Sequence, residues 1–205
     1  MFLHRKPSEE VVRQFIASQQ DLPFSYEQLG ATRSQLGSVD GGYTVDHNRI
    51  KLGQGRGIYE RAMSALRSWQ QFDLGWVTVV PPGKSLEVGT TVAVQAKVFG
   101  LWSLNAARIV YVIDENEAGH TTFGFAYGTL PDHVEDGEER FTVEWCADDS
   151  VWYDIYAFSR PKHPLARIGF PITRMLQKRF ARDSLAIMKS CVDKIGRGLT
   201  RTIRI

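Results

Sequence analysis

The chain has 205 residues, of which 43% are apolar and 23% charged, a composition typical of one globular domain with a single core. No stretch approaches the length of about 20 apolar residues that a membrane-spanning helix needs, and the amino-terminal residues are charged too early for a secretory signal peptide. The two cysteines, Cys146 and Cys191, lack the spacing of a metal site and the density of a disulfide scaffold. We therefore expect one cytoplasmic domain with reduced thiols.

The formal net charge of +2 conceals a strong asymmetry. Residues 160–205 carry twelve Lys and Arg against two Asp, a net charge of +10, whereas the remainder carries thirteen basic and twenty-one acidic residues, a net charge of −8. Such a basic segment could steer the protein toward an anionic membrane surface, a nucleic acid or an acidic protein. Alternatively, it lies across the acidic remainder of the chain or carries a solvated face. No groove-reading motif is present, so we predict no specific nucleic-acid binding.

The amino-terminal part is predicted to hold two helices and one strand. Ser8, followed by two Glu and a periodic apolar run, indicates an N-capped amphipathic helix that ends near Gln20. The pattern Gly-x-Gly-x-Gly at 53–57 lacks the remainder of any phosphate-binding motif, so it indicates a strand-to-helix turn. After the first helix we expect a loop over residues 22–42, a strand over 43–52 and a helix over 58–69.

Six strand-like segments follow, separated by turn signals. They cover residues 75–80, 91–99, 107–114, 120–129, 139–146 and 151–158. The turn between the fourth and the fifth of them covers Pro131–Gly137. Alternation of apolar and polar residues in the second and fifth segments is typical of an antiparallel sheet with one buried face.

The segment from Thr122 to Thr129 has two unequal faces. Its aromatic residues alternate with Gly124, Ala126 and Gly128, which leave the other face without bulk. Glycine inside a strand marks the close approach of another element or of a ligand. This face therefore either packs tightly under a helix or lines a hollow.

The carboxy-terminal segment is predicted to form a long amphipathic helix. After a short turn from about Leu165, Pro171 fits the first turn of a helix that runs to about Val192, and a frayed tail follows Lys194. A meander of antiparallel strands curling around this helix would bury both apolar surfaces. We therefore predict an α+β fold, with a curved antiparallel sheet of about seven strands wrapped around the long C-terminal helix and an extra N-terminal helix. It resembles the helix-grip arrangement of the Bet v 1, START and polyketide-cyclase superfamily, whereas a closed lipocalin-like barrel is the competing layout.

At the level of motifs, nearly the whole chain resembles the DUF1990 family, also called UPF0548. The motifs are Arg108-Ile-Val-Tyr-Val, Phe125-Ala-Tyr-Gly-Thr-Leu-Pro-Asp-His133, Gly137-Glu-Glu-Arg-Phe141, Ser150-Val-Trp-Tyr-Asp-Ile155, Ala157-Phe-Ser-Arg-Pro161 and Gln177-Lys-Arg-Phe-Ala-Arg182. The resemblance implies a domain of unestablished biochemical function and no known catalytic residues. Within a single domain 1–205 we expect an N-terminal helix and loop (1–42), a helix-grip core (43–193) and a basic tail (194–205).

Four titratable side chains cluster within seven residues at the predicted turn. His133, Glu135, Glu138 and Glu139 could form a metal site or an acid–base group, or they could instead bind the exposed backbone amides of a structural turn. No Ser-His-Asp order, carboxylate pair or Cys-His dyad is convincing, so we predict no metal ion and no cofactor and assign no catalytic residue.

Our leading hypothesis is that the protein binds a small apolar or amphipathic molecule, such as a lipid-like, isoprenoid or aromatic compound, between the sheet and the C-terminal helix. The candidate ligand-binding residues are Arg108, Phe125, Tyr127, Thr129, His133, Glu138, Trp152, Tyr153, Ser159 and Arg160. Their aromatic members could instead complete the core, and the arginines could pair with acidic residues.

Two alternatives belong to other functional classes. The first is an enzyme of the cyclase or hydrolase type that uses His133 with Glu138 or Glu139 as acid and base. The second is an interaction module whose basic C-terminal helix docks on an anionic membrane surface or on an acidic protein. We expect a monomer or a weak dimer.

Overall fold

The computed structural model describes residues 1–34, 39–117, 119–162 and 170–193. Its helices are α1 (Glu9–Gln19), α2 (Arg56–Arg67) and α4 (Phe170–Asp193), with short 3-10 helices η1 (Ala31–Ser34) and η2 (Gln70–Phe72). Its strands are β1 (Phe2–Leu3), β2 (Thr44–Gln54), β3 (Val77–Val80), β4 (Thr91–Val98), β5 (Leu101–Glu117), β6 (His120–Thr129), β7 (Glu135–Cys146) and β8 (Ser150–Pro161). The turn expected from about Leu165 and the tail after Lys194 lie outside the described residues.

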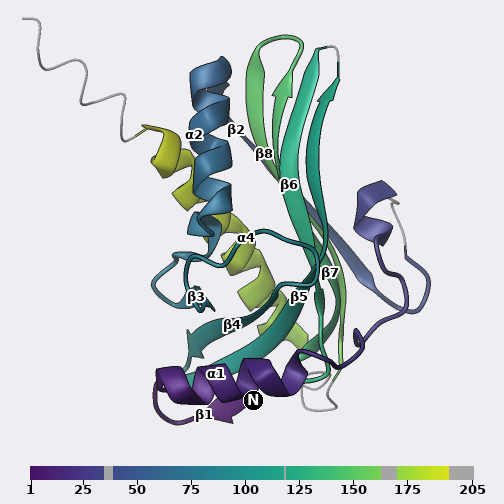
Figure 1. Cartoon of the computed structure of the whole chain (residues 1–205), viewed down its shortest axis with the longest axis vertical. Helices are drawn as coiled ribbons and strands as arrows, with labels where there is room; N and C mark the ends of the chain where they lie inside the picture. Colours follow the sequence, from purple (N-terminus) through teal and green to yellow (C-terminus); the bar gives the residue numbers. More distant parts are fainter. Residues whose placement is uncertain (35–38, 118, 163–169, 194–205) are drawn as a thin grey trace, which may run out of the picture.

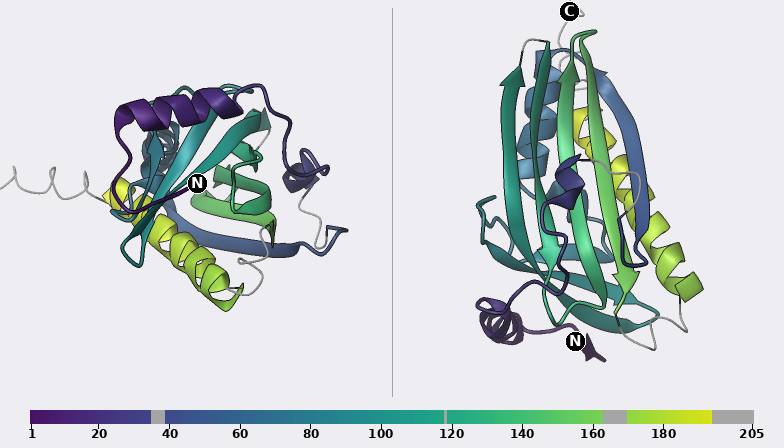
Figure 2. Two further views of the ribbon diagram at one scale, coloured as in Figure 1. Left: turned by 90° about the horizontal axis from the view of Figure 1, so that it is seen from below. Right: turned by 90° about the vertical axis from the view of Figure 1, so that its right-hand side faces the viewer.

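The strands form one curved sheet, with α2 and α4 on its concave side (Figure 1). Strands β3 to β8 follow one another as a meander, and β2 joins β8, which gives the order β2-β8-β7-β6-β5-β4-β3, while β1 pairs with β5. All of these pairings are antiparallel. Helix α1 crosses the end of the sheet near β4 and β5 (Figure 2). The predicted α+β architecture, with its extra N-terminal helix, is confirmed, and within the described residues β2 and β3 end the sheet at opposite edges without closing a barrel.

Two strands begin several residues before the position that the sequence pattern predicts. Strand β5 begins at Leu101 instead of residue 107, because Phe99 and Gly100, with φ angles of 51° and 80°, form a two-residue hairpin turn after β4. Strand β7 begins at Glu135 instead of residue 139, and its first three residues pair with the end of β8. In the sequence, the acidic residues of this segment are typical of a turn. In the structure they lie on both faces of β7. The turn before β7 is thereby reduced to residues 130–134.

The glycine pattern after β2 is a strand-to-helix turn, as predicted. Gly55 lies between the last residue of β2 and the first of α2 with φ at 87°, a region that favours glycine. Its amide N–H donates to the carbonyl oxygen of Asp149 at 2.9 Å, which ties the turn to the loop between β7 and β8.

The main core fills the space between the concave face of the sheet and helices α2 and α4. Phe141 lies in this core, fully buried, and its ring centroid is 5.4 Å from Phe72, 5.5 Å from Phe125 and 6.4 Å from Phe180. Burying each such ring stabilises the fold by about 1.5–3 kcal/mol. These aromatic contacts bring the sheet, η2 and α4 together at the level of Phe180.

The glycine face of β6 is closely packed. A Cβ atom at Gly128 would lie 2.2 Å from Oη of Tyr26, and one at Gly124 would lie 2.2 Å from the carbonyl oxygen of Phe141. The aromatic residues of the same strand belong to the main core on the opposite face. Of the two alternatives left open by the sequence, close packing is therefore correct. The element that covers Gly128 is the N-terminal segment rather than a helix.

This N-terminal segment is anchored on the convex face by Glu138. The residue is 2% exposed, and its carboxylate accepts hydrogen bonds from Oη of Tyr26 (2.7 Å), the amide of Gly30 (2.8 Å) and the amide of Thr32 (3.0 Å). The hydroxyl group of Thr32 also donates to it. Because four donors surround the carboxylate here, the acidic group of Glu138 faces away from the concave side of the sheet.

Candidate functional site

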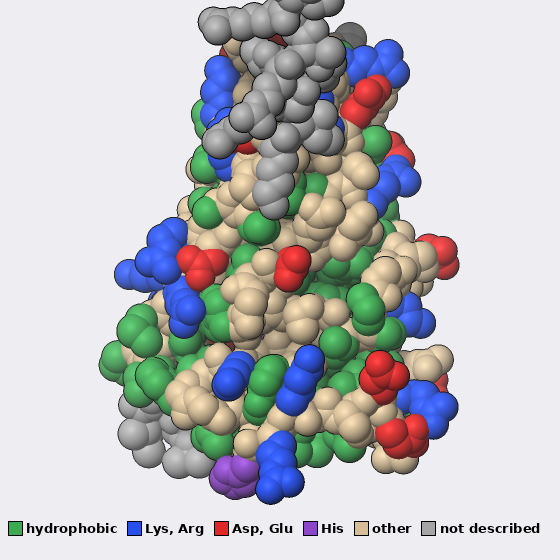
Figure 3. All heavy atoms as spheres, turned by 90° about the vertical axis from the view of Figure 1, so that its left-hand side faces the viewer, with side chains coloured by type: hydrophobic (Ala, Val, Ile, Leu, Met, Phe, Trp, Pro, Cys, Tyr) green, Lys and Arg blue, Asp and Glu red, His purple; other side chains and the backbone are tan. Residues whose placement is uncertain are grey.

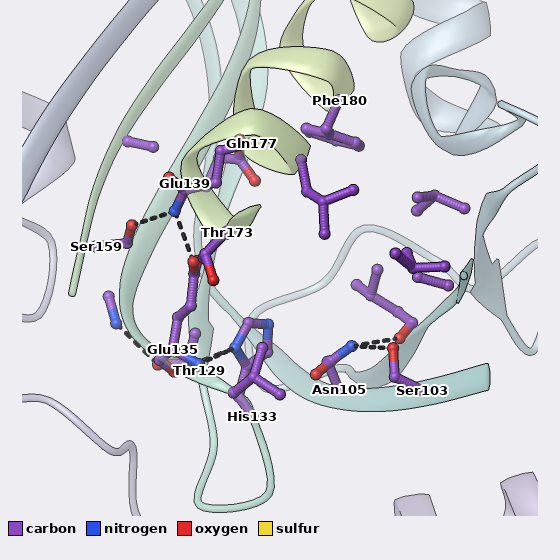
Figure 4. Close-up of a pocket in the computed structure, with 18 of the residues that line it drawn as sticks. Ser103, Asn105, Thr129, His133, Glu135, Glu139, Ser159, Thr173, Gln177 and Phe180 are labelled. Atoms are coloured by element: carbon purple, nitrogen blue, oxygen red, sulfur yellow. Dashed lines mark hydrogen bonds between the residues drawn. The ribbon is translucent and has the colours of Figure 1, made fainter. Parts of the chain in front are cut away.

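A cavity of about 1350 Å³ lies between the concave face of the sheet, the first half of α4 and the hairpin of β4 and β5. This volume suits a molecule larger than a typical metabolite, since small-molecule sites commonly range from about 300 to 1,000 Å³. Most of the lining is apolar and includes Phe72, Trp76, Val77, Val94, Leu176 and Phe180. Polar side chains gather at one end, where β7, β8 and the start of α4 meet (Figure 4).

Two glutamates of β7 form the centre of this polar end. Glu135 and Glu139 are four positions apart on one strand and therefore share its inward face. Oε1 of Glu135 accepts a hydrogen bond of 2.6 Å from Nε2 of Gln177, which also approaches Oγ of Ser159 at 2.9 Å (Figure 4). Oη of Tyr127 donates to Oε2 of Glu139 at 2.7 Å. The contacts hold both carboxyl groups in place through neutral side chains.

Burial shifts the acidity of both groups. Desolvation raises the pKa of Glu135 to about 7, against the opposing effects of the Gln177 hydrogen bond and the charge of Arg174. Desolvation likewise raises the pKa of Glu139 to about 7, against the opposing hydrogen bond from Tyr127. Among the described residues neither carboxylate forms an ion pair, because Arg174 binds Asp46 through both of its terminal nitrogens. At neutral pH each carboxyl group is therefore near the midpoint of its titration.

His133 contributes a neutral ring to the same cavity. Its Nδ1 lies 3.1 Å from both the amide nitrogen and the carbonyl oxygen of Glu135. Burial, the largest cause, lowers the pKa of His133 to about 4. The imidazole is therefore uncharged at neutral pH. Within the described part of the chain Nε2 has no hydrogen-bond partner, which leaves this nitrogen available to a ligand.

Asn105 of β5 also belongs to the cavity wall, and His133 lies between it and Glu135 (Figure 4). Its Nδ2 donates to the carbonyl oxygen of Val94 at 3.3 Å and to Oγ of Ser103 at 3.2 Å. Its Oδ1 is buried and accepts no hydrogen bond from any described residue. Leaving a buried acceptor unpaired costs about 1–3 kcal/mol.

The structure separates the ten candidate ligand-binding residues into groups. Four of them line the cavity, namely Tyr127, Thr129, His133 and Ser159. Glu138 also belongs to the lining, although its carboxylate is held on the convex side. Phe125 and Tyr153 are fully buried in the main core, where Oη of Tyr153 lies 3.0 Å from Oγ of Ser184. His133 and Glu138 are thus not brought together as an acid–base pair, whereas His133 and Glu139 line one cavity.

The remaining three candidates are absent from the described lining of the cavity. Arg108 donates to backbone carbonyl groups at the end of α1, at 3.0 and 2.9 Å. The guanidinium group of Arg49 lies 4.7 Å from the ring centroid of Trp152, and Arg160 donates to the carbonyl oxygen of Gly41 at 2.9 Å. These contacts give all three side chains structural partners.

Further residues that supply polar groups to the cavity are missing from the residues predicted to bind a ligand. They include Asn105, Glu135, Glu139 and Gln177. Asn105 is a polar residue inside an otherwise apolar run. Glu135 stands an even number of positions from Glu139, which places both on one face of a strand. Gln177 follows Leu176, a residue of the apolar stripe of the C-terminal helix. These signals are visible once the strand boundaries are known.

The basic residues of α4 are largely engaged within the chain. Ion pairs join Arg174 to Asp46, Arg179 and Arg182 to Asp183, and Lys189 to Asp193. These pairs favour the interpretation that the described part of the helix neutralises acidic residues of its own chain. None of the described helices is long and apolar enough to cross a membrane. No group of three or more acidic, His or Cys side chains in the described ranges could hold a metal ion.

A curved antiparallel sheet that encloses an apolar cavity with a long C-terminal helix defines the helix-grip class. The sequence assigns the chain more closely, because residues 25–187 match the model of the domain of unknown function DUF1990. The chain belongs to this family. It is 37% identical to a UPF0548 protein of Dictyostelium discoideum, over 94% of this chain and 96% of that protein. It is 36% identical to a UPF0548 protein of Deinococcus radiodurans, over 89% of this chain and 94% of that protein.

Solved structures with a similar arrangement are distant in sequence. A START superfamily protein from Mycobacterium smegmatis is 12% identical with a TM-score of 0.48, covering 76% of this chain and 99% of that one. Human STARD10 is 8% identical with a TM-score of 0.47, covering 97% of this chain and 85% of that one.

Proposed function

We propose that the protein binds a small, largely apolar molecule in the cavity between the sheet and α4. The observation that carries the proposal is the combination of a large apolar lining with a few polar groups gathered at one end. Such a site buries the body of a ligand through the hydrophobic effect and fixes its orientation through the polar groups.

A substitution in the wall that fills part of the cavity tests whether a ligand binds there. Ala157 of β8 lines the cavity and is only partly buried, so Ala157→Phe places a ring in the space that the ligand would occupy. We expect a saturable fluorescence increase with the neutral probe N-phenyl-1-naphthylamine, and a loss of affinity of about tenfold or more in the variant, as for a lost apolar contact. Native mass spectrometry of freshly purified protein, followed by extraction, would identify a retained passenger.

The matched control for this test is Ala186→Phe, at an exposed position of α4. This variant makes the same chemical change outside the cavity and should keep the affinity of the unaltered protein. Equal affinities for all three proteins would contradict binding in the cavity.

A second candidate function is docking on an anionic membrane surface through the mouth of the cavity. The exposed apolar side chains Phe2, Phe99 and Ile172 line this mouth and are 69%, 76% and 49% exposed. Lys97, near the end of β4 and two residues before Phe99, and Lys178, on α4 with Ile172, are exposed. The face in Figure 3 carries hydrophobic and basic side chains next to one another, a combination that suits the negatively charged surface of a lipid bilayer.

Sedimentation with vesicles of phosphatidylcholine and phosphatidylserine tests the second candidate. We expect Phe99→Asp to lower the partition coefficient about tenfold, because it removes one inserted aromatic ring and adds a repelled charge. Leu29→Asp is the control, since Leu29 is 52% exposed on the convex side. If neither variant differs from the unaltered protein, or if that protein does not sediment at low salt, membrane docking is wrong.

A further inference from the structure

We propose that the polar end of the cavity selects molecules that carry an amine on an apolar body. The amine would lie at the carboxyl groups of Glu135 and Glu139. This inference rests on the proposed function, because it names the chemical class of molecule that the same cavity takes.

The first argument is the imbalance between acceptors and donors at this end. Glu135 and Glu139 are buried carboxyl groups without a cationic partner among the described residues. Arg174 is the basic side chain whose charge acts on Glu135, and it is committed to Asp46 through hydrogen bonds from both terminal nitrogens. Lys162 also lines the cavity, but its Nζ donates to the carbonyl oxygen of Pro131 at 2.8 Å. Met1 and Lys178 line the cavity too, but the ammonium group of Met1 donates to the carbonyl oxygen of Leu104 at 3.0 Å and Lys178 is exposed. Among the described residues no cation pairs with either carboxyl group, so a positive charge on the ligand would be the first to do so.

The second argument is the match between donors and acceptors. Oε1 of Glu135 accepts from Gln177 and Oε2 of Glu139 accepts from Tyr127, so the other oxygen of each carboxyl group has no donor among the described residues. Both residues belong to the cavity wall. An ammonium group has three N–H donors and no acceptor, which matches carboxyl oxygens without a donor.

Proton balance favours the same class. At pH 7 an alkyl amine enters as R–NH3⁺, and a carboxyl group that was protonated releases its proton to solvent, so that a carboxylate faces the ammonium group. Burial raises the pKa of both glutamates to about 7, which keeps this exchange within the physiological range. A fatty acid would instead bring a further negative charge to a buried acidic site, which the low dielectric makes unfavourable. A neutral alcohol lies between these two cases.

The experiment compares three molecules with one apolar tail. Isothermal titration calorimetry at pH 7 with decylamine, decanol and decanoate, below their micelle concentrations, should give the tightest binding for decylamine, by about tenfold over decanol, and the weakest for decanoate. Decylamine binding should also release protons, seen as a heat that depends on the ionisation enthalpy of the buffer. In the double variant Glu135→Gln with Glu139→Gln, the preference for decylamine should vanish while decanol still binds. Glu117→Gln removes an exposed glutamate at the far end of β5 and should leave all three affinities unchanged.

The outcomes separate this inference from the proposed function. If decanol or decanoate binds as tightly as decylamine, the amine preference is wrong while the cavity still binds apolar molecules. If none of the three binds, both proposals fail. Should the double variant not fold, the ligand series on the unaltered protein and on the single variant Glu139→Gln decides the question.

Discussion

Replacing Glu138 by alanine is expected to lower the free energy of unfolding by about 4 kcal/mol, because several buried donors then lose their acceptor. The carboxylate binds Tyr26, Gly30 and Thr32, which together hold the N-terminal segment on the convex face of the sheet. Without it, the hydroxyl of Tyr26 and two backbone amides stay buried without an acceptor. Urea denaturation followed by tryptophan fluorescence measures the change.

The control for this prediction is Glu117→Ala, which removes a glutamate from an exposed position and should change the free energy of unfolding by less than about 0.5 kcal/mol. Tyr26→Phe removes one of the four hydrogen bonds and should cost about 1 kcal/mol, which keeps the prediction measurable if Glu138→Ala does not fold. A loss below 1 kcal/mol for Glu138→Ala would show that the carboxylate does not anchor the segment. Probe affinity of the folded variant should stay unchanged, because this carboxylate lies outside the cavity.

Glu138 and Glu139 show what the sequence could and could not predict about the site. The sequence predicts a turn that ends at Gly137 and a strand that begins at Glu139, whereas in the structure both glutamates are neighbours on β7 and point to opposite faces. Once β7 is extended back to Glu135, the inward positions Phe141 and Val143 fix Glu139 and Glu135 as inward too. The acid–base hypothesis therefore named the correct segment. Without the boundary of β7 it could not tell that Glu138 anchors the N-terminal segment while Glu139 lines the cavity.

The overall fold was easier to predict than the site because it depends on many residues at once. The order of elements, the antiparallel sheet and the long helix follow from periodicity in segments of eight residues or more. The direction of one polar side chain, in contrast, depends on a boundary that can shift by several residues. Arg108 illustrates this point, because its strand neighbours Ala107 and Ile109 face the core and direct its guanidinium group to the end of α1.

The buried glutamates of the cavity should make the protein less stable as the pH rises. Glu135 and Glu139 have a pKa of about 7 in the folded chain against 4.5 when exposed. Between these values the folded state binds more protons than the unfolded state, so the free energy of unfolding falls with pH and their stabilising contribution is lost through pH 7. His133 acts in the opposite direction, because its pKa is lowered from 6.5 to about 4, so its contribution is lost as the pH falls from 6.5 toward 4. Two carboxyl groups outweigh one imidazole, and we expect a net loss of about 3 kcal/mol between pH 5 and pH 8.

Glu139→Gln tests the origin of this loss, because the amide keeps an acceptor for Tyr127 and carries no charge. At pH 8 the variant should be more stable than the unaltered protein by about 2–3 kcal/mol, and at pH 5 the two should agree within about 1 kcal/mol. Urea denaturation at pH 5, 6, 7 and 8 measures both curves, with Glu117→Gln as the exposed counterpart that should run parallel to the unaltered protein. Parallel curves for Glu139→Gln as well would mean that Glu139 titrates normally, and the buried acidic end of the cavity would then lose its main electrostatic support.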